Sequence, residues 1–351
     1  MNLGVTLRLA LLGGILGVGS LRAERIVLVA GGAEDHTGIP ATRAALKEPF
    51  GVDFDAAGNL FIIEMAAGNR LLKVDAQGIL THVAGQLTAG DAGDGGPPLS
   101  ARFQGPHNLA VLPGDDVLIA DTWNGRLRRV SLARDTVTSL PGFNVPAAQA
   151  RSAGPYCIAL DSTGTRVFIA DLRRVHVVDV KTGEARVVAG NGQKGIPPDG
   201  ALAVEAPLLD PRAVAVDRHG NVYILERGGH ALRVVGRDGR IRTVVNVSGK
   251  KGSTGDGGAA LAATMNGPKH LCVDHDDNVL IADAENNLIR RYVPATGKIL
   301  RVAGTGKKGT AGLGGPPEQS ELNRPHGVTI AADGTLYITD SYNNRILKIV
   351  R

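Results

Sequence analysis

The chain repeats one short pattern six times along its length. Each copy opens with proline, continues as a short apolar run and a polar turn, and ends in a second apolar run closed by Asp or Glu. Consecutive opening prolines are 57, 49, 56, 57 and 57 residues apart, at Pro49, Pro106, Pro155, Pro211, Pro268 and Pro325. A repeat of about this length is typical of propellers and arrays, in which each repeat is one supersecondary unit.

Each copy has the pattern of a four-stranded sheet. Residues 213–216 alternate with a period of two and are rich in β-branched side chains, which favours a first strand. A second strand follows the turn and ends at the acidic residue. Residues 126–130 and 345–349 indicate a third strand, and residues 185–190 and 299–304 a fourth. Four strands joined by tight turns describe a propeller blade, so we predict an all-β, six-bladed β-propeller with four-stranded antiparallel blades.

The two ends of the chain are expected to share one blade. The sixth copy stops after its third strand, and residues 25–32 match the ending of the fourth strands. Pairing residues 25–31 with residues 345–350 would close the ring and remove an exposed sheet edge. We therefore predict a single propeller over residues 24–351.

Residues 1–23 have the pattern of a secretory signal peptide. One positive charge precedes the apolar stretch 9–19, and small residues that a signal peptidase accepts lie between Ser20 and Ala23. The stretch is about half the length needed to span a bilayer. We expect a secreted or periplasmic protein with no membrane span.

Charge and cysteine content limit the partners. The formal charge of +5 is spread over the chain without a long basic run, which argues against nucleic acid as a partner. Cys157 and Cys272 lie in copies that are not neighbours in a ring, so we expect free thiols. We expect a monomer.

Glycine-rich junctions separate several of the copies, for example residues 90–98, 255–258 and 312–317. Glycines let a backbone approach an ion or phosphate. The aspartates lack the regular spacing of a calcium loop, and turns that need positive φ explain the glycines. We interpret the junctions as structural.

These motifs resemble the NHL repeat family. The resemblance rests on three sequence motifs: the segment of each copy from Gly-Asn to the closing Asp, Asn-Arg-Ile at residues 344–346, and the Gly-Asp-Gly-Gly junction. It covers residues 25–351. Members of that family form six-bladed propellers and serve as lyases, sensor domains or binding modules, so the resemblance implies the fold and leaves the activity open.

One position of the repeat is a candidate binding site. The first strand of each blade lines the central channel, so the residue after each opening proline should lie at one mouth. These residues are Phe50, His107, Tyr156, Arg212, Lys269 and His326. Six side chains that converge from six blades have the geometry of a ligand site. A solvated mouth that merely tolerates polar residues is the alternative.

The chemistry of this position favours an anionic ligand. Arg212 and Lys269 supply positive charge for a carboxylate, sulfate or phosphate on a small molecule, glycan or peptide. Tyr156 and Arg212 are the candidate catalytic residues of an alternative function, a metal-dependent lyase or hydrolase.

Two histidines of the same position suggest a metal. The settings of His107 and His326 resemble the metal-binding histidines of peptidyl-α-hydroxyglycine α-amidating lyase, a resemblance that implies a divalent metal such as zinc. In that lyase three histidines come from alternate blades, whereas here the middle position is Arg212, which cannot bind a metal. Alternation predicts that His270, beside Lys269, turns toward the neighbouring sheet instead of the channel.

A second ring of side chains is acidic. All six copies carry the residue that closes the second strand, so we expect these carboxylates to accept hydrogen bonds from the backbone of the loop that follows. Asp121 and Asp340 share blades with the two histidines and could also orient their imidazoles. The ring consists of Glu64, Asp121, Asp171, Glu226, Asp283 and Asp340.

Overall fold

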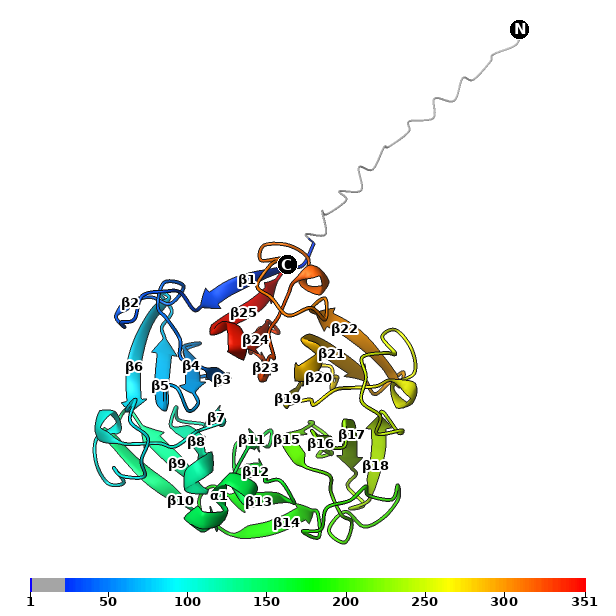
Figure 1. The fold of residues 1–351 in the computed structure, drawn as a ribbon, viewed down its shortest axis with the longest axis horizontal. Coiled ribbons are helices and arrows are strands. Elements are labelled where there is room, and N and C mark those ends of the chain that lie inside the picture. The colour runs from blue at the N-terminus through cyan, green and yellow to red at the C-terminus, as the bar shows by residue number, and fades with distance from the viewer. Residues whose placement is uncertain (2–22) are drawn as a thin grey trace.

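Six antiparallel sheets surround a central axis in the computed structural model, which describes residue 1 and residues 23–351 (Figure 1). The predicted all-β six-bladed propeller is confirmed. The signal-peptide prediction falls on residues 1–23, nearly all of them outside the described residues. No helix within residues 23–351 is long and apolar enough to cross a membrane.

Each blade runs outward from the channel in four strands. Blades 1 and 2 contain β3 (Pro49–Phe54), β4 (Leu60–Glu64), β5 (Arg70–Val74), β6 (Ile79–Gly85), β7 (Asn108–Val111), β8 (Val117–Asp121), β9 (Arg126–Ser131) and β10 (Thr136–Asn144). Blades 3 and 4 contain β11 (Cys157–Leu160), β12 (Arg166–Ala170), β13 (Val175–Asp179), β14 (Ala185–Ala189), β15 (Pro211–Val216), β16 (Val222–Glu226), β17 (Ala231–Val235) and β18 (Ile241–Val245).

Blades 5 and 6 contain β19 (His270–Val273), β20 (Val279–Asp283), β21 (Leu288–Val293), β22 (Lys298–Ala303), β23 (Gly327–Ile330), β24 (Leu336–Asp340) and β25 (Arg345–Val350). The outer strand of blade 6 is β1 (Arg25–Ala30), which pairs with β25 so that Arg25 lies opposite Val350. The two ends of the described chain therefore share one sheet, as the sequence predicts.

Helices are short and confined to the connections. The one α-helix within residues 23–351, α1 (Ala147–Ala153), lies between blades 2 and 3. The 3-10 helices are η1 (Pro98–Ser100), η2 (Thr122–Asn124), η3 (Ala260–Ala262), η4 (Ala284–Asn286), η5 (Pro317–Gln319) and η6 (Ser341–Asn343).

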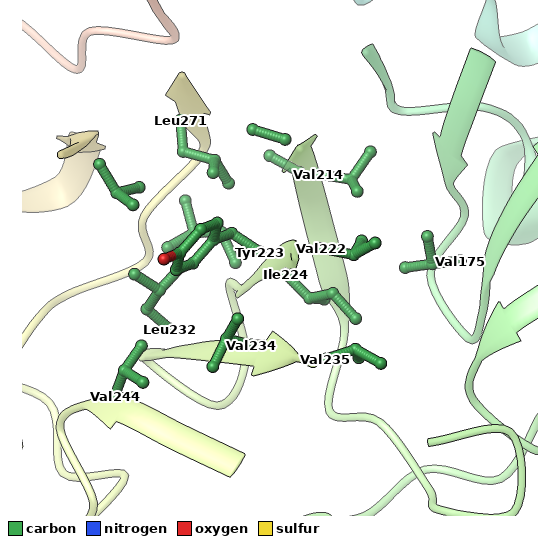
Figure 2. Close-up of a cluster of buried hydrophobic side chains, with 14 of the residues drawn as sticks. Val175, Val214, Val222, Tyr223, Ile224, Leu232, Val234, Val235, Val244 and Leu271 are labelled. Carbon is green, nitrogen blue, oxygen red and sulfur yellow. The ribbon is translucent and has the colours of Figure 1, made fainter. Parts of the chain in front are cut away.

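The core lies between neighbouring blades. Because side chains alternate across a strand, each sheet presents apolar residues to the blades on both sides. Figure 2 shows one such cluster, in which Val214, Ile224 and Leu232 of blade 4 gather with Val175 of blade 3 and Leu271 of blade 5. Blade-to-blade packing of this kind holds the inner ends of the strands, and the residues they carry, in a fixed ring.

The acidic ring is structural, with one correction. In five blades the carboxylate accepts a backbone N–H from the junction that precedes the blade, whereas we expected the loop that follows. Lys47 N donates to Glu64 Oε1 at 2.6 Å and Gln104 N donates to Asp121 Oδ1 at 2.8 Å, and Glu226, Asp283 and Asp340 do the same. Only Asp171 accepts backbone N–H groups from its own following loop. Asp121, Asp283 and Asp340 instead accept a hydrogen bond from an asparagine side chain of that loop. Five carboxylates thus tie a junction to a blade.

Glycine-rich junctions have a structural role too. In four junctions a pair of residues exchanges two backbone hydrogen bonds with one residue of an outer strand, and β2 (Ile39–Pro40) pairs with β6 in the same way. Asp256 in one junction also pairs with Arg290, at 2.7 Å. The glycines and aspartates therefore cover sheet edges and anchor loops.

Candidate functional site at the channel mouth

The residues after the opening prolines pack against one another at one end of the channel. Phe50 stacks on His326 with ring centroids 4.2 Å apart and meets His107 edge-on at 5.3 Å. His107 contacts Tyr156 at 4.8 Å, and the Arg212 guanidinium lies 3.9 Å from the centre of the Tyr156 ring. The structure thus brings together five of the six predicted residues in one chain of contacts, which we call the mouth ring.

Both histidines of the mouth ring have a defined tautomer. His107 Nδ1 lies 2.7 Å from the carbonyl oxygen of Gly105, and His326 Nδ1 lies 2.8 Å from that of Arg324. Because a carbonyl oxygen only accepts, Nδ1 carries the proton in each ring and Nε2 keeps its lone pair. These carbonyls orient the imidazoles, so the expected orienting role of Asp121 and Asp340 is wrong.

The same histidines are neutral at pH 7. Burial lowers the pKa of His107 well below its ordinary value, and the positive charge of Arg212 adds to the effect. Burial, together with Lys269 and Arg212, lowers the pKa of His326 in the same direction. Each Nε2 can therefore accept a hydrogen bond or a proton at neutral pH.

The mouth ring holds a cation without a carboxylate partner. Arg212 is 7% exposed, and no carboxylate of residues 23–351 lies within ion-pair distance of its guanidinium. Burial, followed by the charge of Arg227, lowers the pKa of Arg212 to about 10, which leaves the group protonated at pH 7. The Tyr156 ring and the more distant Asp210, which is itself paired with Arg227, offset only part of the cost of burying this charge. The guanidinium is therefore poised to take an anion.

Lys269 adds a second positive charge beside the mouth ring. Burial lowers its pKa to about 8, with Arg212 as the next cause. Its acidic neighbour is Glu285, 3.6 Å away, and that carboxylate also bonds Arg324. Positive charge therefore exceeds negative charge around the mouth ring.

Two aromatic side chains extend the mouth ring outward. Trp123 lies 5.9 Å from the His107 ring and is covered by the Arg151 guanidinium at 4.0 Å. Tyr342 stacks on His326 at 5.6 Å and is 45% exposed. The loops after the second strands of blades 2 and 6 thus supply an aromatic rim.

Two side chains meet across the channel beneath the mouth ring. His270 Nε2 of blade 5 lies 3.1 Å from Asn108 Nδ2 of blade 2, on the opposite side of the channel. His270 Nδ1 accepts a hydrogen bond from Val328 N of the neighbouring blade at 3.3 Å. The predicted turn toward that blade is therefore confirmed, but the expectation that His270 avoids the channel is wrong. Beyond this pair a separate cavity of about 220 Å³ follows the inner strands.

The mouth ring does not fit a three-ligand metal site. Within the described part of the chain, no three His, Cys, Asp or Glu side chains are grouped to hold a metal ion. The position that a third histidine would need is Arg212. The two histidines alone fall short of the three protein ligands of a catalytic zinc site.

Comparison with known proteins agrees with this architecture. Residues 103–129 and 322–349 match the NHL repeat, and residues 181–254 match the Teneurin NHL domain. These matches cover three segments of the six-bladed propeller. SUPPRESSOR OF QUENCHING 1, a chloroplastic protein of Arabidopsis thaliana, is 23% identical over 266 residues, which cover 70% of this chain and 25% of that protein.

Solved structures share the fold at low identity. An auxiliary nutrient binding protein from Bacteroides thetaiotaomicron superposes with a TM-score of 0.68 at 14% identity, over 93% of this chain and 76% of that one. Virginiamycin B lyase from Staphylococcus aureus superposes with a TM-score of 0.53 at 14% identity, over 87% and 95%. Binding proteins and lyases therefore both use this architecture.

Proposed function

We propose that this NHL-repeat propeller binds an anionic ligand at the mouth ring. The observation that carries the proposal is Arg212, a buried guanidinium without a carboxylate partner in the described chain. Lys269 beside it reinforces the positive charge. A carboxylate, sulfate or phosphate would replace the missing partner through charge-assisted hydrogen bonds, which are the strong contacts in such sites.

The aromatic rim supports a ligand with an organic body. Trp123 contacts His107 and Tyr342 stacks on His326, and the guanidinium groups of Arg151 and Arg324 lie over the two aromatic rings. An apolar and cationic rim of this kind suits a small molecule, a glycan or a peptide that carries the anionic group. The signal-like residues 1–23 and the nutrient-binding neighbour support a role outside the cytoplasm, in the periplasm or the medium.

The neutral imidazoles favour a second function at the same place. His107 Nε2 or His326 Nε2 could remove a proton from a bound substrate, because both rings are neutral and held by backbone carbonyls. Arg212 would stabilise negative charge that develops on the substrate, and Tyr156 lies against both His107 and Arg212. This chemistry would make the protein a lyase or hydrolase.

Calorimetric titration with a panel of carboxylated, sulfated and phosphorylated sugars and peptides tests the binding function. Arg212→Gln should weaken binding of any hit by about tenfold to a hundredfold, since a hydrogen bond to a charged group contributes about 1.5–3 kcal/mol. The matched control is Arg242→Gln, which removes one charge from an exposed residue of the outer strand β18. Equal affinities for the two variants would contradict the proposal.

A further inference from the structure

The outer edges of five blades are covered by the chain itself. In each, one apolar residue of the outer strand exchanges backbone hydrogen bonds with a junction or, in blade 1, with β2 and Gly38. Gly200 N, for example, donates to Ile241 O at 2.8 Å, and Ile241 N donates to Ala201 O at 3.0 Å. The covered residues are 0–1% exposed and comprise Ile26, Leu80, Val137, Ile241 and Ile299.

Blade 3 departs from this arrangement. Ala185 of β14 lies opposite Val178, as Ile241 lies opposite Val235 in blade 4, so the two positions are equivalent. Ala185 is exposed, and β14 pairs only with β13 in the described chain. The junction before blade 3 is the short one, where the spacing of opening prolines falls to 49 residues and α1 replaces the glycine-rich loop.

A groove adjoins this open edge. It has a volume of about 610 Å³ and is lined by Arg186 and Val188 of β14 and by the exposed Leu202 and Val204 of the next junction. Because side chains alternate along a strand, Arg186 and Val188 lie on the same face of the sheet. Figure 1 shows β14 on the outer side of the ring, remote from the channel.

The groove has unbalanced positive charge. Four arginines and two aspartates line it. Asp161 is already paired with Arg166 at 2.9 Å, and Arg218 pairs with Asp277 at 2.6 Å. Arg186 and Arg237 have no acidic partner in the described chain. Charge complementarity therefore favours an acidic occupant.

We propose that the outer edge of β14 is a docking site for an extended, acidic segment of a partner protein. The segment adds to blade 3 as a fifth strand, and its backbone pairs with the outward N–H and C=O groups of Ala185 and Val187. Its residue beside Arg186 is acidic, and its residue beside Val188 is apolar. This site is separate from the mouth ring and does not depend on the function proposed there.

The probe is a short fluorescein-labelled peptide that repeats Glu-Thr-Val-Thr, so that glutamate and valine follow each other at every second position and share one face of the strand. It is added to the full chain and followed by fluorescence anisotropy. The same peptide with lysine in place of each glutamate is the comparison. We expect the glutamate peptide to bind and the lysine peptide not to bind. Equal binding of the two peptides, or binding of neither, would overturn the proposal.

Two variants test the mode of docking. Ala185→Pro removes the outward N–H and places a ring in the path of the added strand, while proline is tolerated on an edge strand. We expect at least about tenfold weaker binding, whereas the matched Ala185→Val keeps the N–H and the affinity. Arg186→Glu should reverse the preference in favour of the lysine peptide. Unchanged binding in Ala185→Pro and Arg186→Glu would overturn the proposal.

Circular dichroism of each variant verifies the fold. Two further measurements distinguish an acidic partner at β14 from binding at the mouth ring and from a second copy of this chain. Arg212→Gln should bind the glutamate peptide normally, and loss of binding there would place the peptide at the mouth ring instead. A dimer in analytical ultracentrifugation that Ala185→Pro dissociates would identify a second copy as the occupant and overturn the acidic partner.

Discussion

His270 should make the protein sensitive to mild acid. Burial lowers the pKa of His270 to about 4 from an ordinary value of 6.5, because its imidazole lies inside the channel, 3.1 Å from Asn108. The unfolded chain therefore takes up this proton near pH 6.5 and the folded chain only near pH 4. The neutral imidazole therefore leaves the free energy of unfolding undiminished above about pH 6.5. As the pH falls from 6.5 to 4, protonation of the unfolded chain lowers that free energy.

The magnitude follows from the two pKa values. At pH 5 the imidazole is nearly all protonated in the unfolded chain and mostly neutral in the folded protein. The free energy of unfolding is therefore about 2 kcal/mol lower at pH 5 than at pH 7 through this group alone. Other groups that titrate in this range also change the wild-type stability. A variant that removes only this imidazole isolates its contribution.

Urea unfolding of wild type and His270→Gln at pH 7 and pH 5 measures the effect. Wild type should lose about 2 kcal/mol more than His270→Gln between the two values, whatever the absolute stability of the variant. The control is His275→Gln, an exposed position on the same blade, which should follow wild type. Equal losses in wild type and His270→Gln would refute the buried, neutral state of this imidazole.

Three further outcomes are expected. Deletion of residues 23–32 removes β1 and exposes the edge of β25. The melting temperature in calorimetry should then fall by several degrees, or the protein should aggregate, and an unchanged melting temperature would contradict the shared blade. Burial raises the pKa of the Cys157 thiol to about 12 and that of Cys272 further still, so mass spectrometry should find both thiols unmodified by iodoacetamide at pH 8 in the native protein and alkylated in guanidinium. Rapid native labelling would contradict that burial. N-terminal sequencing of exported protein should begin after a cleavage between Ser20 and Ala23, and an intact Met1 in a cytoplasmic fraction would disprove export.

Much of the fold could be predicted because its information is local and repeated. Alternation within one copy identifies the strands, and the partner of residues 25–31 is evident because the sixth copy lacks a fourth strand. The junctions were harder to interpret. A junction covers one residue of an outer strand and is held by one carboxylate of the acidic ring. The sequence does not show which residues these are, because the choice depends on how neighbouring blades pack in space.

The site was predictable in its members but not in its packing. The residue after each proline identifies the mouth ring, yet its close contacts depend on the diameter of the channel. The pairing of Asn108 with His270 joins blades 2 and 5 across the channel, and neither copy contains a signal for it. The short spacing of 49 residues in the sequence indicates that the junction before blade 3 is reduced. That this leaves the edge of β14 open is evident only by comparison with the five blades whose edges are covered.

The central claim is that Arg212 anchors an anion at the mouth ring. Anomalous diffraction from crystals soaked in sodium selenate tests it most directly, because selenium marks the position of a bound oxyanion. The account predicts a selenium peak within hydrogen-bond distance of the Arg212 guanidinium, on the side of the aromatic rim. Selenium peaks at exposed arginines with none at Arg212 would contradict it.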